Sequence, residues 1–258
     1  LHLIVIVGAL LMFFPFLWTI VTSITPGANL GVTPDLIPKN PSLEAYVRLF
    51  TERPFGRVIF NSVLLATITT AIQLFTSSTA GYAFSRLPFR GQTAVFAVYL
   101  ATMMIPLQVL IVPLFVELKT FGLLNTYLGA LLPTFASAFG IFLLRQAINQ
   151  VPRELDETAF LDGHSGTGFF FRHLIPALAP GIAVAAFFCF VFSWIEVVFA
   201  RILTVTSGKP ITVAISAMFG FQTDIGAVMA MTCLSFLPAL VLIVLVRNHL
   251  AKGYVLRA

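Results

Sequence analysis

Hydrophobic residues occur in long uncharged runs along this chain, and short segments between the runs hold most of the charge. Six runs contain no Asp, Glu, Lys or Arg, and they lie at Leu3–Ile24, Val58–Ser85, Thr93–Val116, Thr126–Leu144, Ala177–Ile195 and Ile225–Val246. A helix needs about 20 mainly apolar residues to cross the hydrocarbon core of a bilayer. Counting neighbouring apolar residues, the pattern predicts spans at about 3–24, 58–85, 93–116, 126–148, 177–199 and 225–248. We therefore expect an all-α membrane protein with six transmembrane helices in a single domain, 1–258.

Two prolines, Pro106 and Pro113, lie inside the third run. A proline removes one hydrogen bond from a helix interior, and in membranes neighbouring helices or waters satisfy the freed carbonyl. The third span is therefore predicted to be bent or interrupted. The bend is either a hinge or a shaped packing surface, and the sequence does not separate the two.

The connections between the runs differ in length and in character. The first, Thr25–Arg57, is long and rich in proline, and we expect a short helix near Leu43–Thr51. The others are the turn Arg86–Gly91, the short connection Lys119–Asn125, the charged segment Gln150–Pro176 and the loop Arg201–Asp224, which is expected to hold a partial helix.

Composition supports a membrane location and argues against nucleic acid as a partner. The chain is 59% hydrophobic and 10% charged, whereas soluble domains carry roughly 25% charged residues. The net charge is +5, but the basic residues are scattered singly between apolar runs and form no basic stripe. Cys189 and Cys233 lie inside runs, so neither a disulfide framework nor a metal spacing is indicated.

Charge asymmetry indicates which side of the membrane each connection occupies. With six spans, the two termini, the 86–91 turn and the 150–176 segment share one side, which then holds eight basic residues against seven on the other. The positive-inside rule applies to short loops, and leaving out the long first loop, with its four basic residues, changes the ratio to eight against three. We therefore expect these segments to be cytoplasmic.

The segment "VPRELDETAFLDGHSGTGFFFRHLIP", Val151–Pro176, contains its own helix signals. Pro152 is suited to the first helical position, where a missing N–H costs nothing. The acidic residues that follow lie near the positive end of the helix dipole, and they are Glu154, Asp156 and Glu157. Gly163 supplies a stop. The pattern predicts a short helix, a glycine turn and a second short helix outside the membrane.

A solvated amphipathic loop is the simplest interpretation of such a charge run. The length argues against it, because idle connections are only a few residues long. The apolar groups 159–161 and 169–171 also argue against it. An element with one charged side and one apolar side at the cytoplasmic surface favours docking to a second protein.

The same segment resembles the cytoplasmic EAA loop of ABC-importer membrane subunits. That pattern is roughly Glu-Ala-Ala, two residues, Asp-Gly, and a hydrophobic-Pro ending about a dozen residues later. The chain departs from it at Thr158, where alanine is usual, and at His164, where a small residue is common. The resemblance implies an ATPase-coupling role for Glu157, Thr158, Ala159, Asp162, Gly163, His164, Arg172 and Pro176.

The resemblance extends over nearly the whole chain. "FNSVLLATITTAIQLFTSSTAGYAFSRLPFRG", "MMIPLQVLIVPLFVELKTFGLLNTYLGALLP" and "GIFLLRQAINQVPREL" are similar to the carbohydrate-importer permeases of the MalG class, which are type I importers. It implies a bacterial inner-membrane permease that carries a sugar-like solute. It implies three partners: a second permease subunit in a heterodimer, an ABC ATPase dimer, and an extracytoplasmic solute-binding protein or lipoprotein. ATP and Mg would be bound by the ATPase, with no cofactor and no catalytic site in this chain.

Polar residues within or beside the runs are candidates for a solute pathway. They are Asn61, Gln108, Ser193, Trp194 and Glu196. The polar side chains serve equally well as hydrogen-bond partners of neighbouring helices, and Trp194 equally well as an interface anchor. Glu196 is notable because ionisable residues within spans are usually functional, although it also suits the outer end of the fifth span. An ion-gradient-driven transporter that uses Glu196 is therefore the alternative function.

Overall fold

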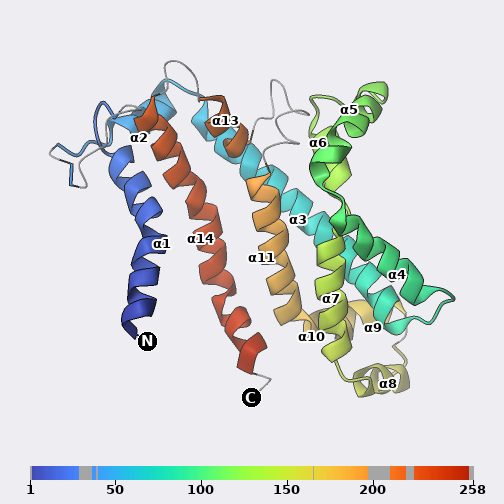
Figure 1. Cartoon of the computed structure of the whole chain (residues 1–258). Helices are drawn as coiled ribbons and strands as arrows, with labels where there is room; N and C mark the ends of the chain where they lie inside the picture. Colours follow the sequence, from blue (N-terminus) through green and yellow to red (C-terminus); the bar gives the residue numbers. More distant parts are fainter. Residues whose placement is uncertain are drawn as a thin grey trace. The chain divides into compact units, whose positions relative to one another are not determined.

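The computed structural model describes residues 2–28, 37–38, 40–164, 166–196, 210–218 and 224–255, and the side chains of 107, 108 and 248–255 lie outside this description. The regular secondary structure of these residues is helical, as expected for an all-α protein (Figure 1). The chain divides into two compact units. Unit one comprises Leu1–Val63 with Gly208–Leu240, and unit two comprises Leu64–Ser207 with Val241–Ala258. Each unit is described by itself.

Unit one contains two long apolar helices and two short ones. They are α1 (His2–Ser23), α2 (Glu44–Thr51), α13 (Ile211–Ala217) and the first part of α14 (Ile225–Val255), together with the first residues of α3 (Phe55–Arg86). Most of the large apolar side chains of α1 are exposed, which suits contact with lipid. Helix α2 matches the short helix predicted at 43–51, and α13 is the partial helix predicted within 201–224, of which 201–209 and 219–223 lie outside the described residues.

Polar contacts hold the helices of unit one together. The Ser23 hydroxyl at the end of α1 lies 2.7 Å from the Tyr46 hydroxyl of α2, and Cys233 of α14 donates to Ser23 at 3.8 Å. The Ser62 hydroxyl of α3 accepts from the backbone N–H of Ile211 at 2.5 Å, at the start of α13. Burial raises the pKa of the Tyr46 phenol, and its hydrogen bond to Ser23 opposes that rise.

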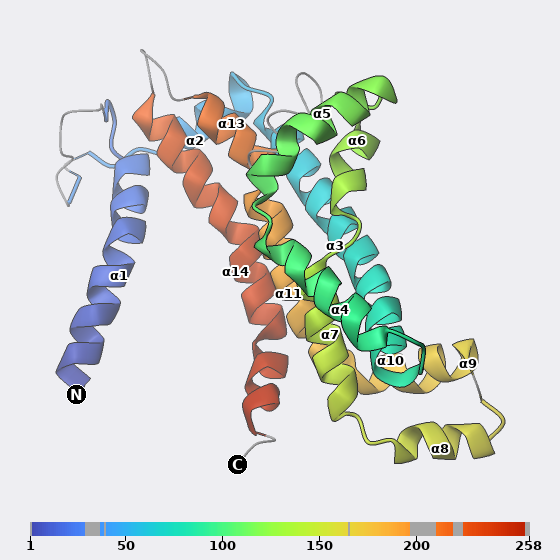
Figure 2. The same ribbon diagram turned by 45° about the vertical axis from the view of Figure 1, so that its right-hand side comes forward.

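Unit two holds the remainder of α3, the part of α14 from Val241 onward and a series of shorter helices (Figure 2). They are α4 (Gln92–Ala101), η1 (Thr102–Met104), η2 (Leu107–Leu110), α5 (Ile111–Thr120), α6 (Tyr127–Leu131), η3 (Leu132–Thr134), α7 (Ala138–Gln150), α8 (Glu154–Leu161), α9 (Thr167–Phe169), η4 (Phe170–Leu174), α10 (Ile175–Ala177) and α11 (Ala179–Ile195). The η1, η2 and η3 segments are 3₁₀ turns and η4 is a π-helix.

The third apolar run is interrupted, as its prolines predict. Helical structure ends at Met104, Ile105 is extended with ψ 114°, and the chain resumes as η2 after Pro106. Pro113 is the third residue of α5, and a proline in the first turn removes no intrahelical hydrogen bond. Pro106 therefore marks the break, and Pro113 lies where a helix tolerates it.

Small residues allow α7 to pack closely against α3 and α11. A Cβ added at Gly140 of α7 would lie 2.5 Å from the Ser77 hydroxyl of α3, and one added at Gly181 of α11 would lie 2.7 Å from Ala147. Close backbone approach of this kind is the usual packing mode of membrane helices. These contacts place α7 against both helices, and its last residue, Gln150, leads directly into the charged segment.

Three helices in the described residues are long and apolar enough to cross a membrane: α1, α3 and the Ile225–Arg247 part of α14. Two bent pairs satisfy the same test, and they are Tyr127–Thr134 with Ala138–Gln150, at 49°, and Thr167–Ala177 with Ala179–Ile195, at 80°. Gln92–Met104 is a shorter apolar helix. The described helices thus occupy each predicted run, and the count of six spans stays a prediction.

Candidate functional site

The charged segment folds as the helix–turn–helix that the sequence predicts, and it belongs entirely to unit two (Figures 1 and 2). Its first helix, α8, begins at Glu154 with Arg153 as the N-cap residue, and the Arg153 side chain makes no capping hydrogen bond. The expectation that Pro152 occupies the first helical position is therefore wrong by two residues. Instead the Pro152 carbonyl accepts from the Leu155 N–H at 3.3 Å, so the proline forms the turn that leads into the helix.

Gly163 terminates α8 in a Schellman motif. Its φ is +79°, a conformation that glycine adopts without a steric penalty. The His164 N–H donates to the Ala159 carbonyl at 2.8 Å, and the Gly163 N–H donates to the Phe160 carbonyl at 3.0 Å. These two bonds satisfy carbonyls that would otherwise be unpaired at the helix end. The predicted glycine turn is therefore a defined reversal of the chain.

The second limb runs from Thr167 to Ala177 through α9, the π-helix η4 and α10. It meets α11 at 80°, so it crosses the end of that helix instead of extending it. Pro176 lies near the end of this continuous helical limb, where its missing N–H leaves one carbonyl of the preceding turn without an intrahelical donor. The π-turn was not anticipated. Turns of this kind are frequent at functional sites.

The inner face of the segment is a compact apolar cluster. Ala159 of α8 is 1% exposed and packs with Phe169, Phe170 and Leu174 of the second limb, and the partly buried Leu155 joins the same cluster. Leu155 and Ala159 are four residues apart, so they share one face of the helix. The alanine predicted for coupling is therefore a packing residue that binds the two limbs together.

The outer face of α8 carries acidic, polar and large apolar side chains. Glu157, Thr158 and Asp162 are exposed, and so are Phe160 at 68% and Leu161 at 85%. The Thr158 hydroxyl donates to the Glu154 carbonyl one turn back at 2.8 Å. Exposed apolar side chains with a polar surround mark interaction sites, and here they stand directly before the glycine turn.

His164 joins the turn to the second limb. Its Nε2 lies 3.0 Å from Nη1 of Arg172, and its Nδ1 lies 3.2 Å from the Asp162 carbonyl. Because a guanidinium can only donate, Nε2 accepts and Nδ1 carries the proton. The ring also meets His173 edge-on, with centroids 5.0 Å apart. The structure thus brings together His164 and Arg172, two of the residues predicted from the loop pattern.

Arg86 contacts the charged segment, although the sequence pattern did not single it out. It is the last residue of α3, and its side chain is only 6% exposed. Its Nη2 donates to the Val151 carbonyl at 2.6 Å and to the Ile148 carbonyl at 3.3 Å, and its Nε lies 3.3 Å from Oδ2 of Asp156. In the sequence it resembles an ordinary basic residue flanking a span, so only the folded chain identifies its partners.

The candidate solute-pathway residues lie in different parts of the chain. Asn61 is buried in the α3 portion of unit one. Ser193 and Trp194 lie in the last turn of α11 in unit two, where Trp194 is buried and stacks on Phe190 with ring centroids 5.7 Å apart. Glu196 is the residue directly after α11, with extended backbone, so it sits at a helix end. Gln108 lies in η2, and its side chain is outside the description.

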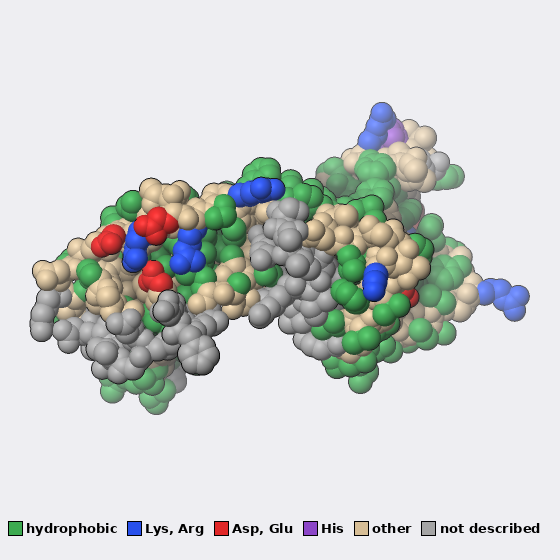
Figure 3. All heavy atoms as spheres, turned by 90° about the horizontal axis from the view of Figure 1, so that it is seen from above, with side chains coloured by type: hydrophobic (Ala, Val, Ile, Leu, Met, Phe, Trp, Pro, Cys, Tyr) green, Lys and Arg blue, Asp and Glu red, His purple; other side chains and the backbone are tan. Residues whose placement is uncertain are grey.

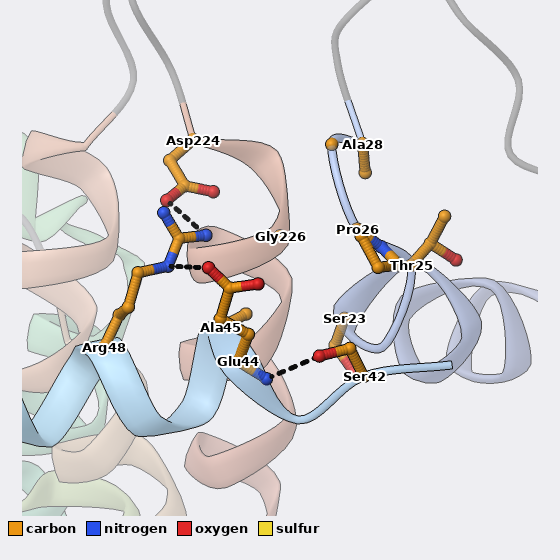
Figure 4. Close-up of a pocket in the computed structure, with 11 residues that line it drawn as sticks. Ser23, Thr25, Pro26, Ala28, Ser42, Glu44, Ala45, Arg48, Asp224 and Gly226 are labelled. Carbon is orange, nitrogen blue, oxygen red and sulfur yellow. Dashed lines mark hydrogen bonds and ion pairs between the residues drawn. The ribbon is translucent and has the colours of Figure 1, made fainter. Parts of the chain in front are cut away.

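Unit one carries a polar hollow of about 590 Å³ where α1 ends, α2 begins and α14 starts. Its charged lining is an ion-paired group: Nη2 of Arg48 lies 3.4 Å from Asp224, and its Nε lies 3.8 Å from Glu44 (Figure 4). Asp224 also caps α14 by accepting from the Ala227 N–H at 3.0 Å. Figure 3 shows acidic and basic side chains grouped in the part of that view occupied by α2.

These two ion pairs bear on the predicted topology. Arg48 belongs to the first connection and Asp224 to the fifth, so their contact requires those two connections to share a side of the membrane. Arg86 borders the second connection and Asp156 belongs to the fourth, which likewise must share a side. The number of spans itself stays a prediction. In the described residues no group of three or more His, Cys, Asp or Glu side chains could hold a metal ion.

Comparison with known proteins relates this geometry to a family. Residues 73–254 match the family of binding-protein-dependent transport system inner membrane components. The chain is 30% identical over 248 residues to the lactose transport system permease protein LacG of Rhizobium radiobacter, covering 95% of this chain and 90% of that protein. It is 29% identical to the trehalose/maltose transport system permease protein MalG of Thermococcus litoralis, covering 98% and 94%.

A solved structure has the same fold. It is the crystal structure of a bacterial ABC transporter involved in the import of the acidic polysaccharide alginate, with a TM-score of 0.83 and 21% identity, covering 96% of this chain and 94% of that one. The family match spans more than half of the chain and includes the whole helix–turn–helix segment. The chain therefore belongs to the binding-protein-dependent transport system inner membrane component family, and it is a multi-pass membrane permease.

Proposed function

We propose that this chain is a membrane-spanning subunit of an ATP-driven importer for a sugar or sugar-derived solute. A separate ATPase dimer supplies the energy, a second permease subunit completes the pathway, and an extracytoplasmic binding protein delivers the solute. The carbohydrate class rests on the relatives, whose names specify lactose, trehalose and maltose. The termini and the 150–176 segment face the cytoplasm in this proposal.

The observation that carries the coupling role is the construction of α8. The helix buries Leu155 and Ala159 against the second limb and turns Phe160 and Leu161 outward. A docking helix needs both properties, because its inner face must be fixed to the spans and its outer face must bury apolar surface on the partner. Burying a large apolar side chain contributes roughly 1.5–3 kcal/mol. Glu157 adds a carboxylate on the same exposed surface.

The ion-gradient alternative depends on Glu196 as a coupling group within the membrane. The placement of Glu196 just past the end of α11 favours a helix-end position, and the family match favours ATP-driven import. ATP hydrolysis is assigned to the partner, since this chain shows no phosphate-binding loop in its sequence.

The test is uptake by the assembled importer, reconstituted in liposomes with its ATPase, second permease and binding protein. Labelled lactose, trehalose and maltose are the probes. We expect ATP-dependent accumulation of at least one probe, with no accumulation when the ATPase is omitted. Accumulation that persists without the ATPase and collapses when the ion gradient is dissipated would establish the alternative.

Glu157→Ala tests the docking surface within the same system. We expect weaker co-purification of the ATPase and lower solute-stimulated ATP hydrolysis. Glu52→Ala is the matched control, because Glu52 is an exposed glutamate at the end of the other eight-residue helix, α2. Equal ATPase recovery and equal stimulation in the two variants would remove Glu157 from the coupling surface.

A further inference from the structure

The end of α3 contacts both limbs of the 150–176 segment. Tyr82 and Arg86 are four residues apart, so they lie on one face of the last turns of the helix. Tyr82 meets the second limb, with its ring centroid 6.2 Å from that of Phe169 and 5.5 Å from that of Phe170. Arg86 meets the first limb through Asp156. Neither limb is connected to α3 in sequence, since α7 precedes the segment and α11 follows it.

Arg86 is held by more than its ion pair. The two carbonyls that accept from Nη2 belong to Ile148, in the last turn of α7, and to Val151, just beyond it. Adjacent to this site the Ser85 hydroxyl lies 2.5 Å from Oδ1 of Asn149. One arginine therefore ties the end of α3 to the end of α7 and to the first turn of α8.

The Arg86 side of this pair is shielded from solvent, and the Asp156 side is partly shielded. The Arg86 side chain is 6% exposed and Asp156 is 30% exposed. Water and salt screen buried pairs much less than exposed ones. Two hydrogen bonds from Nη2 to the backbone orient the guanidinium against the end of α7, and its Nε then faces Asp156 as an ion pair without a hydrogen bond. A flexible or fully solvated contact would not transmit a displacement in this way.

We infer that Arg86 and Asp156 form a joint through which movement of α8 is passed to α3. This inference rests on the proposed function, because it concerns what happens after the ATPase moves α8. Arg86 and Asp156 are positioning residues: α8 meets the partner, whereas the joint carries the displacement into a 32-residue helix that the segment does not otherwise adjoin in sequence. Tyr82 supports the joint from the second limb.

The lead test is Asp156→Asn in the assembled importer, which removes the charge and keeps the size of the side chain. Three quantities are measured: ATPase recovered with the membrane subunits, ATP hydrolysis with and without the binding protein, and uptake of whichever of lactose, trehalose and maltose the wild type accumulates. We expect unchanged ATPase recovery and continued basal hydrolysis. Stimulation by the binding protein and uptake per ATP should fall about fivefold or more, the usual lower range of an inter-site coupling energy.

Glu154→Gln is the matched control. It removes one carboxylate from the same first turn of α8, so it weakens the interaction with the helix dipole equally, but Glu154 is exposed and lies two residues from the joint. We expect coupling close to that of the wild type. Arg86→Lys is the second variant. It keeps the charge but loses the fork, and it should give an intermediate loss with normal ATPase recovery.

The outcomes separate the joint from the proposed function. The proposal of a joint is overturned if Asp156→Asn and Arg86→Lys show the same binding-protein stimulation and the same uptake per ATP as Glu154→Gln. The importer function then still stands. If the wild type recruits no ATPase, the proposed function fails instead. If the Asp156→Asn variant does not assemble, the ratio of uptake to ATP hydrolysed is measured in Arg86→Lys and Asp156→Glu instead. A purely structural role would leave this ratio unchanged.

Discussion

Among the described residues, two helices of eight residues lie outside the long apolar runs, α2 in unit one and α8 in unit two, and each contains one partner of an arginine–aspartate pair. In α2 the arginine is on the short helix, its side chain is 40% exposed, and its partners are two carboxylates. In α8 the helix supplies the aspartate, and the arginine comes from the end of a long helix where it is almost fully buried.

The two arginines differ in their exposure to solvent and in the groups that they bind. The Arg48 side chain is 40% exposed, so solvent and salt screen its ion pairs more than that of the 6% exposed Arg86. Arg86 also donates to two backbone carbonyls, so its removal would take the guanidinium donor from the Val151 carbonyl and the cationic partner from Asp156. Helix α2 is therefore held mainly by its buried residues, Ala45 and Leu49, whereas α8 combines the apolar contacts of Leu155 and Ala159 with a polar connection to α3.

Removing each arginine is expected to produce the largest contrast between the two helices. Arg86→Ala should lower the free energy of unfolding by about 3 kcal/mol, because it breaks a buried pair and leaves buried acceptors unsatisfied. Arg48→Ala should lower it by at most about 1 kcal/mol. The measurement is the thermal unfolding midpoint of the purified membrane complex in detergent, at low and at high salt.

Salt provides the internal check on that contrast. High salt should reduce the effect of Arg48→Ala, since exposed pairs are screened, and should leave that of Arg86→Ala nearly unchanged. Similar midpoint shifts for the two variants, or an equal response to salt, would show that burial does not distinguish the two pairs.

The local features of this comparison were largely predictable from sequence. The short helix predicted at 43–51 is α2, and the predicted glycine turn is at Gly163. Both predictions rest on residues that are close together in the sequence. For α2 these are an apolar i, i+4 pair, and for the turn it is a residue that tolerates a positive φ. The break near Pro106 was predictable for the same reason.

The partners of charged residues were not predictable. Arg86 has the sequence context of any basic residue flanking a span, and its contacts with 148, 151 and 156 exist only because α3 and α7 pack closely through small residues. The assignment of Pro152 to the first helical position was wrong because its carbonyl accepts from the Leu155 N–H in a turn that precedes the helix. Which residues line a solute pathway stays a prediction.

Helix α8 ends at a residue with a positive φ, Gly163, and Gly163→Ala tests the contribution of that stop. Nothing lies within 4 Å of a Cβ added at Gly163, but its φ is +79°, so the penalty is conformational, about 1–2 kcal/mol. We expect faster proteolytic cleavage in the 161–167 turn and reduced coupling to the ATPase. Gly56→Ala is the control, because it has equal space and lies in α3 without a positive φ, and alanine there should be neutral or stabilising. Equal protease sensitivity would argue against a Schellman stop.

The smallest effect is expected at Thr158, where the chain departs from the Glu-Ala-Ala pattern. The Thr158 hydroxyl is directed back to the Glu154 carbonyl of its own helix at 2.8 Å, so it already has a hydrogen-bond partner that no ATPase needs to supply. Thr158→Ala should change stability by no more than about 0.7 kcal/mol, in the stabilising direction, because alanine is the better helix former. ATPase recovery and binding-protein stimulation should match the wild type. His164→Ala is the contrasting variant, since it removes the contact with Arg172 across the turn. If Thr158→Ala instead lowered binding-protein stimulation more than His164→Ala, the exposed threonine would itself be part of the docking surface. The ATPase would then contact α8 through Thr158 as well as through Phe160 and Leu161.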